Sequence, residues 1–473
     1  MSVETLIPGN PRSQCHCSDC LTGRHILARP TVRPFFSAVG DFKSGNDTPR
    51  AYLERCLASL AEFEPLVGAF AHLEIDAAKV AADLSSERWR KGRPLSRVDG
   101  MPVGIKDIIE TIDMPTQCGS PVYKGWRSGR DAASVAALRQ AGAVILGKTV
   151  TTEFAGTVAR GTRNPWDSQR TPGGSSSGSA AAVACGMVPV AIGTQVIGSI
   201  LRPASFCGVV GVKPSFGAIN RGGSHDGLSQ SAHGPLAATL EDAWIVAREI
   251  VNRVGGDPGY PGLFGPEDPP APSRPKRLAL LETPGWSVAE PPARAAFEAA
   301  IETIRATGVE IVDRRNHSGI AAVEAALERA RIVSLQIIVW ESIWPLNTYR
   351  AESPAKVSAF LLEKLGEAEK MTLDDYRSLL TERERIRSEY AKLAGDCTAA
   401  ITLAAPGPAP VGLASTGDPV FNIPASLLAV PAISIPVLAV DGLPLGVQIM
   451  GYLHGDASLF SAAVWIRDLI NSD

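Results

Sequence analysis

Apolar residues recur in short runs and at helical spacing through the middle of the chain, separated by polar or glycine-rich turns. Residues 101–105 form a continuous apolar run, which predicts an interior strand that delivers Lys106 to its protected end. Residues 132–141 have helical spacing, and residues 143–146 are again apolar. This alternation continues through residues 100–217 and predicts an α/β fold in which helices cover both faces of a sheet.

The flanking segments extend this outline. Residues 48–63 open with Thr-Pro and carry apolar positions at helical spacing, which predicts a helix. A proline- and glycine-rich crossing at 255–275 leads into a strongly helical region, 291–395. Strand character returns after that region and is expected to close the same sheet, at residues 399–404, 432–437 and 446–450.

The domain organisation follows from these segments. A chain of 473 residues allows about three domains by length, but one large α/β unit also fits. Residues 1–45 are rich in proline and polar residues and are interpreted as a flexible N-terminal extension. We expect residues 46–473 to form a single domain, with 291–395 as a helical region that covers a substrate pocket.

Charge and hydropathy exclude several classes of protein. The formal net charge is −3 and the 46 basic residues are dispersed, so no nucleic-acid-binding surface is expected. The longest uncharged stretch, 171–201, is long enough to span a membrane, but its internal glycines, Pro189 and Gln195 favour a buried helix and strand. The first residues lack a basic region followed by an apolar core, so no secretory signal is expected.

The cysteines indicate a reducing compartment. Five of the eight are scattered, and Cys185 and Cys207 have apolar neighbours, as expected of reduced interior thiols in a cytoplasmic protein. The other three, Cys15, Cys17 and Cys20, lie within six residues that also include His16. These groups could ligate zinc, but they lack the loop that separates paired cysteines in zinc sites. We therefore expect neither a metal nor a cofactor.

Three separated segments carry the candidate chemistry, each with one amine or hydroxyl. Lys106 follows the apolar run in GMPVGIKDIIE, Ser175 lies in TPGGSSSGSA, and Ser199 lies in GTQVIGSILRPASFCG. A serine nucleophile needs a neighbouring group to take its proton, and none of the seven histidines lies in these segments. A buried lysine can serve instead, because burial lowers its pKa and favours the neutral amine.

These motifs closely resemble the amidase signature family. Ser175 and Ser199 are 24 residues apart with Lys106 ahead of both, and GGSS, a G-S-I segment followed by proline, FCGVVGVKPS and GLPLGVQIMG occur in the family's order. The resemblance runs from about residue 45 to the C-terminus. It implies a large mixed, mainly parallel twisted sheet, in which Ser199 is the nucleophile, Ser175 a bridging serine in a cis peptide, and Lys106 the base.

The resemblance also implies further site residues. The backbone N–H groups of Val196, Ile197, Gly198 and Ser199 are expected to form the oxyanion hole. Gly174, Trp340 and Trp344 are candidates for substrate binding, with Phe360 and Tyr376 as further pocket-lining candidates in the helical region.

The nucleophile segment departs from the family pattern T-D-x-G-G-S-I-R. Gln195 stands where the family has aspartate, Ile197 where it has the first glycine, and Leu201 where it has arginine. If the aspartate and arginine normally form a pair, losing both leaves no uncompensated charge. The two changes are therefore interpreted as concerted, while Ile197 bears on substrate scope and the geometry of the hole.

Two enzymatic functions and one binding function are compatible with these residues. The first is hydrolysis of a small amide, carbamate or urea-like compound through an acyl-enzyme on Ser199. The alternative is an amidotransferase-like subunit that supplies ammonia to a partner protein. The lost charge pair, the long helical region and the absence of a basic surface favour the first, and the presence of all three catalytic positions argues against a non-catalytic binding protein. The sequence leaves the oligomeric state open, with a homodimer as one option.

Overall fold

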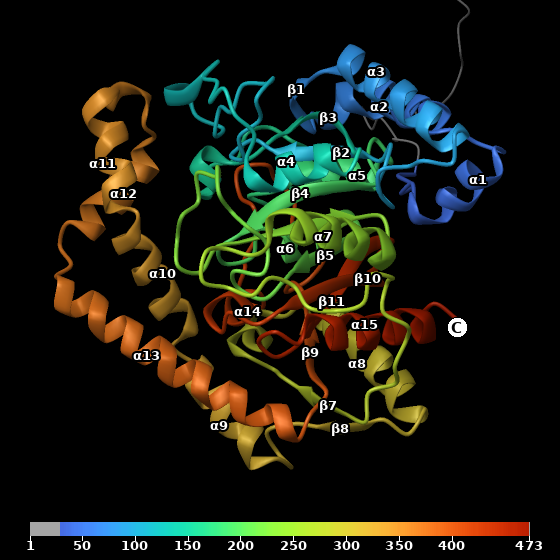
Figure 1. The fold of residues 1–473 in the computed structure, drawn as a ribbon. Coiled ribbons are helices and arrows are strands. Elements are labelled where there is room, and N and C mark those ends of the chain that lie inside the picture. The colour runs from blue at the N-terminus through green and yellow to red at the C-terminus, as the bar shows by residue number, and fades with distance from the viewer. Residues whose placement is uncertain (1–28, 473) are drawn as a thin grey trace, which may run out of the picture.

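The computed structural model describes residues 29–472, and one large sheet crosses the whole molecule (Figure 1). Its eleven strands lie in the order β1-β3-β2-β4-β6-β5-β10-β11-β9-β7-β8. The strands are β1 (Phe70–Leu73), β2 (Pro102–Lys106), β3 (Val144–Thr149), β4 (Val190–Gln195), β5 (Val210–Lys213), β6 (Ala232–Ala237), β7 (Arg277–Leu280), β8 (Glu310–Val312), β9 (Ala399–Leu403), β10 (Ala432–Val440) and β11 (Leu443–Met450).

The sheet is mixed, as the sequence predicts, but parallel pairings are its minority. Four neighbouring pairs are parallel (β2–β3, β2–β4, β7–β8 and β7–β9), and the other six are antiparallel. One reason is the hairpin that joins β10 to β11 through Asp441 and Gly442, both at positive φ (51° and 75°). An Asp-Gly pair in this conformation makes a tight two-residue turn, which forces its strands to run antiparallel.

Helices cover both faces of the sheet, as predicted. One face packs against α2 (Pro49–Val67), α3 (Ile75–Arg90), α5 (Ser177–Ala184) and α6 (Leu201–Cys207), and the other against α4 (Ala133–Gln140), α7 (Leu240–Val254), α8 (Pro291–Ala306) and α15 (Asp456–Ile470). Successive strand residues point to opposite faces, so Val103 and Ile105 join the cluster with α4 and α7, while Lys106 points to the other face, toward Ser175 in the loop that leads into α5.

The region 291–395 is helical except for β8. After α8 come α9 (Ser318–Leu327), α10 (Ala330–Glu341), α11 (Ile343–Glu352), α12 (Ala359–Ala368) and α13 (Leu373–Ala391). Figure 1 shows α10 to α13 along one side of the sheet, on the opposite side of the view from the C-terminus. α8 packs on β10 and α15, whereas α10 packs on α13 and on α14 (Ile423–Leu427).

Part of the segment interpreted as an N-terminal extension is folded onto the core. α1 (Val39–Ser44) follows a 3-10 turn, Phe36–Ala38, and the rings of Phe35 and Phe42 pack against Tyr52. The backbone N–H groups of Phe35 and Phe36 donate to the carboxylate of Asp242 at the start of α7. Among residues 29–472, no helix is both long and apolar enough to cross a membrane.

Candidate active site

Lys106 is the last residue of β2 and is completely buried. Its Nζ atom lies 2.7 Å from Ser175 Oγ, 2.7 Å from Thr194 Oγ1 and 3.4 Å from the Thr194 carbonyl oxygen. Burial lowers the pKa of Lys106 to about 7, and the negative charge of Asp226 opposes this shift. A large fraction of this amine is therefore neutral near pH 7 and able to accept a proton.

Ser175 follows a cis peptide bond with Gly174, in a loop that leads into α5. Gly173 has φ +81°, and a Cβ there would lie 2.8 Å from the Pro203 backbone, so both conformation and space require glycine. The next residue, Ser176, is held against β4, because its Oγ donates to the Thr194 carbonyl at 3.2 Å and accepts from the Thr194 N–H at 3.3 Å. These contacts fix the loop beside β4, whose Thr194 also holds the Lys106 amine.

Ser199 lies in the loop between β4 and α6 and is 7% exposed, at the wall of a cavity. The Ser176 N–H donates to the Ser199 carbonyl at 3.3 Å, which joins the two serine loops. Within residues 29–472, the backbone N–H groups of residues 196–199 donate to no protein acceptor. Free donors beside a nucleophile are what an oxyanion hole requires.

Gln195 organises the start of α6. Its Oε1 accepts hydrogen bonds from the Ile200 N–H at 2.9 Å and from the Leu201 N–H at 3.0 Å, and its Nε2 donates to Ser426 Oγ at 3.1 Å. The first N–H groups of a helix have no partner within the helix, so this side chain caps α6. The Leu201 side chain packs in an apolar cluster with Ile423 and Ala425 of α14. Both positions are fully buried and carry no charge.

Asp226 is a second buried ionisable group at the cavity wall. Its carboxylate accepts hydrogen bonds from Ser224 Oγ at 2.6 Å and from Ser231 Oγ, and His233 Nε2 lies 3.8 Å from it. These partners hold the pKa of Asp226 well below its usual range, against the opposing effect of burial. His233 pairs in register with Thr194 across β4 and β6, so this acidic group adjoins the polar neighbourhood of Lys106.

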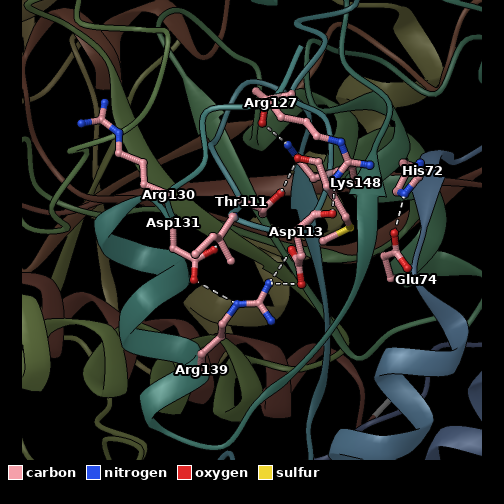
Figure 2. A network of polar contacts seen from close by, with 12 residues as sticks. His72, Glu74, Thr111, Asp113, Arg127, Arg130, Asp131, Arg139 and Lys148 are labelled. Carbon is pink, nitrogen blue, oxygen red and sulfur yellow. Dashed lines mark hydrogen bonds and ion pairs between the residues drawn. The ribbon is translucent and has the colours of Figure 1, made fainter. Parts of the chain in front are cut away.

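A second buried lysine provides a contrast with Lys106. Lys148 of β3 donates to Thr116 Oγ1 at 2.7 Å, and its Nζ lies 3.3 Å from Asp107 Oδ1. It belongs to a polar neighbourhood in which Arg139 of α4 binds Asp113 and Asp131 (Figure 2). Lys148 therefore has a carboxylate partner that favours its charged form, whereas the hydrogen-bonding partners of Lys106 are neutral.

The cavity at Ser199 has a volume of about 600 Å³. Val196, Ile197 and Arg202 form part of its wall, together with Phe154 of a short 3-10 helix (Glu153–Ala155) and helical residues of α10 to α12. Phe154 stacks on Tyr349 of α11 with ring centroids 4.3 Å apart and an interplanar angle of 9°. The helical region therefore contributes aromatic side chains to the wall of the cavity that Ser199 also lines.

The aromatic residues expected at the pocket divide into two groups. Trp344 and Phe360 line the cavity, and Trp344 is 79% exposed. Trp340 and Tyr376 lie outside the cavity wall and stack on each other, with ring centroids 5.5 Å apart. Gly174 is also outside the wall, and its carbonyl accepts a hydrogen bond from Arg202.

The sequence analysis missed several residues that the structure brings to the site, and for all but one of them the sequence holds no motif that would have identified them. Thr194 contacts Lys106 from β4, and Phe154, Tyr349 and Asp226 reach the cavity from distant segments. For Arg202, the sequence shows only a charged residue three positions after Ser199 and does not indicate that it is buried. The motif context of Thr194, at the start of the nucleophile segment, is the one signal that points to it.

The described cysteines are reduced, and none belongs to a metal site. Cys56, Cys118, Cys185, Cys207 and Cys397 are buried free thiols. Within residues 29–472, no group of three or more histidine, cysteine, aspartate or glutamate side chains is placed to hold a metal ion. The Cys15, Cys17 and Cys20 motif lies outside the described residues.

Comparisons with known proteins place the chain among amide-cleaving enzymes. The family model described as Amidase matches residues 51–460. The A subunit of glutamyl-tRNA(Gln) amidotransferase from Chloroflexus aggregans is 32% identical, over 88% of this chain and 92% of that protein. A solved structure described as an amidase has a TM-score of 0.80 at 28% identity, covering 92% of this chain and 99% of its own. Another, from work on the origins of an s-triazine catabolic enzyme, has a TM-score of 0.81 at 26% identity, covering 92% and 98%.

Proposed function

We propose that this chain, which belongs to the amidase family, cleaves a C–N bond of an amide through an acyl-enzyme on Ser199. Lys106 is the base, Ser175 relays the proton, and the N–H groups of Val196, Ile197, Gly198 and Ser199 bind the oxyanion. Residues 46–473 act as one domain in this proposal.

The proton passes from Ser199 through Ser175 to Lys106, whose Nζ lies 2.7 Å from Ser175 Oγ. Ser199 Oγ bonds to the substrate carbonyl carbon and gives its proton to Ser175, whose own proton passes to the neutral amine of Lys106. The carbonyl oxygen becomes negative and is stabilised by the loop N–H groups. When the C–N bond breaks, Ser175 returns a proton to the leaving nitrogen and is reprotonated by Lys106. Water then attacks the carbonyl carbon of the acyl-enzyme and gives its proton to Ser175 and Lys106. The acid is released when the bond to Ser199 Oγ breaks and Ser199 regains a proton.

The observation that carries this proposal is the environment of Lys106. The amine is fully buried, lies 2.7 Å from Ser175 Oγ, and has only neutral oxygen atoms as hydrogen-bond partners. Lys213 is also fully buried, with a neutral hydrogen-bond partner and a pKa near 7, so burial alone does not single out Lys106. What distinguishes Lys106 is its contact with Ser175, in a loop whose Ser176 N–H binds the Ser199 carbonyl.

Two destinations for the released ammonia or amine remain as candidates. The cavity favours free hydrolysis of a small amide with an apolar body, because aromatic and aliphatic side chains such as Phe154, Tyr349 and Phe360 dominate its wall. The curated relatives favour the alternative more strongly, because they are amidotransferase A subunits. Under that alternative, glutamine is the source of ammonia and a partner protein receives it.

The two candidates are separated by assaying the purified chain alone. Ammonia release is measured from a panel of apolar amides, carbamates, ureas and glutamine, with Ser199→Ala as the matched inactive control. Turnover of apolar amides without a partner supports free hydrolysis. Turnover confined to glutamine, and increased by an added partner protein, supports the amidotransferase-like function. A chain that cleaves none of these compounds, with or without a partner, contradicts C–N cleavage.

A further inference from the structure

Arg202 of α6 is a buried cation that the proposed mechanism does not use. The residue is 3% exposed. Its Nε donates to the Thr416 carbonyl at 2.6 Å, and its Nη2 donates to the Gly174 carbonyl at 2.7 Å and to Thr416 Oγ1 at 3.1 Å. Three of its hydrogen bonds therefore go to neutral oxygen atoms, one of them in the peptide bond that precedes Ser175.

The third nitrogen of this guanidinium has no partner. Nη1 is buried, and no hydrogen-bond acceptor from residues 29–472 reaches it. Arg202 also forms no ion pair within this part of the chain. Asp418 is the acid whose charge acts on it, but the Asp418 carboxylate is bonded to Arg331 at 2.8 Å. Burial lowers the pKa of Arg202 to about 10, which reflects the unfavourable free energy of an uncompensated buried charge.

The unpartnered nitrogen lies against the nucleophile loop. A Cβ placed on Gly198 would be 2.7 Å from Arg202 Nη1 and 2.9 Å from Asn422 Oδ1, so the glycine lets the guanidinium approach the residue that precedes Ser199. Asn422 Oδ1 is likewise without a hydrogen-bond partner among residues 29–472, and being neutral it cannot balance the positive charge. Arg202 and Ser199 are both part of the wall of the same cavity.

We infer that Arg202 binds a carboxylate in the acyl part of the substrate, close to the scissile carbonyl. A carboxylate supplies both the missing acceptor and the missing negative charge, and hydrogen bonds between ionised groups are about twice as strong as neutral ones. The substrate class is then an amide whose acyl group carries a carboxylate a few bonds from the carbonyl, with its apolar part against the aromatic wall. The inference rests on the proposed function and holds for either destination of the ammonia.

The first test compares matched substrates. The monoamides of dicarboxylic acids with three to six carbons are assayed against the unbranched neutral amides of the same chain length, and the ratio of kcat/KM is taken for each pair. We expect a preference for the anionic member of roughly 10- to 100-fold at the best chain length, as for a hydrogen bond to a charged group. In Arg202→Met the ratio should fall to about one, whereas Arg202→Lys, which keeps the charge, should retain part of it. A merely structural role would lower both rates together and leave the ratio unchanged.

The second test needs no turnover. The Ser199→Ala protein is titrated with succinate and with the neutral diamide of succinic acid, and binding is measured by calorimetry. We expect succinate to bind more tightly, and to lose this advantage in the Ser199→Ala, Arg202→Met double variant.

The outcomes are distinct for the two proposals. Hydrolysis of neutral amides with no preference for carboxylates, and equal binding of succinate and its diamide, overturn the inference and leave the proposed function standing. Absence of all amide cleavage together with Arg202-dependent binding of succinate contradicts the proposed function alone. If Arg202→Met does not fold, the Arg202→Lys ratio and the binding comparison in Ser199→Ala still decide the question.

Discussion

The side-chain oxygen of Gln195 accepts a hydrogen bond from the backbone N–H of Leu201 at 3.0 Å, so two of the three positions that depart from the family pattern are in direct contact. The contact runs through the backbone of α6, while the Leu201 side chain packs on α14. A glutamine amide oxygen therefore caps the helix here without a charge, and a leucine fills the adjoining space. Because this contact involves the backbone of residue 201 and not its side chain, the interpretation of the two changes as concerted stays a prediction.

Restoring one charge at a time should destabilise the protein. Gln195→Asp would bury a lone carboxylate and Leu201→Arg a lone cation, each at a cost of about 3–5 kcal/mol. The double variant should recover much of this loss, giving a coupling energy well above the ~0.5 kcal/mol of independent sites. Chemical denaturation of the four proteins measures the cycle. If the losses in free energy of unfolding of the two single variants simply add in the double variant, the two positions are not partners. If the new carboxylate pairs with Arg202 instead, Gln195→Asp should lose less than about 3 kcal/mol.

Ser199→Ala should abolish turnover and leave the fold intact. The side chain has no structural hydrogen bond among the described residues, so its loss should reduce kcat/KM by on the order of a thousandfold or more without lowering the unfolding temperature. A fluorophosphonate should label Ser199 in the wild-type protein, as located by peptide mapping. Ser177→Ala is the matched control, because Ser177 lies in the adjoining serine loop at the start of α5. An adduct on Ser175 would reassign the nucleophile.

Lys106→Arg should not restore activity, because a guanidinium keeps its proton at working pH and cannot act as the base. Burial lowers the pKa of Lys106 to about 7, and the proposed mechanism requires its deprotonated form. kcat/KM should therefore rise with pH through about 7 and level off above it, as a property of the coupled lysine and serine. The control is Lys213→Met, since Lys213 is another buried lysine, with a pKa also near 7, that hydrogen-bonds to the Pro214 carbonyl. Near-normal activity of Lys106→Arg would exclude the role.

Ser175→Ala should be milder than Ser199→Ala. In the proposed mechanism Ser175 only relays a proton between Ser199 and Lys106, and a water molecule in the space left by its hydroxyl can take over part of that transfer. We expect kcat to fall by roughly a hundredfold, the usual size of an acid–base contribution. Steady-state kinetics at the pH optimum measure this, and Ser176→Ala serves as a comparison for loss of a neighbouring hydroxyl that holds the loop to β4. Full activity of Ser175→Ala would mean that the relay has been misplaced.

Asp226→Asn should move the rising limb of the pH profile to lower pH. The ionised Asp226 raises the pKa of Lys106, so removing its charge lowers that pKa further. The pH dependence of kcat/KM measures the shift. Glu341→Gln is the matched control, because Glu341 is a carboxylate at the same cavity wall that is bound by Ser229 and Tyr376. A limb that stays in place in Asp226→Asn, or moves equally in Glu341→Gln, would contradict the electrostatic coupling.

Much of the local structure was predictable because periodicity reports the backbone and its burial directly. The apolar run before Lys106 is β2, residues 132–141 contain α4, and the strand at 399–404 is β9 with a difference of one residue. Strand direction was less accessible. Most strand pairs in the sheet are antiparallel because of which strands become neighbours in the fold. Only the pair β10 and β11 has a local sequence motif for its direction, the Asp441-Gly442 turn.

The sequence by itself determined the residue types of the site, because Lys106, Ser175 and Ser199 stand in short motifs whose glycine and serine neighbours have local backbone roles. Only the tertiary structure decided what surrounds them. Thr194 reaches Lys106 across 88 residues of chain, and Arg202 reaches Thr416 across 214. Contacts of this kind depend on the packing of whole elements rather than on local spacing, so an arginine at position 202 looks like any other charge until the fold buries it beside the nucleophile loop without a partner.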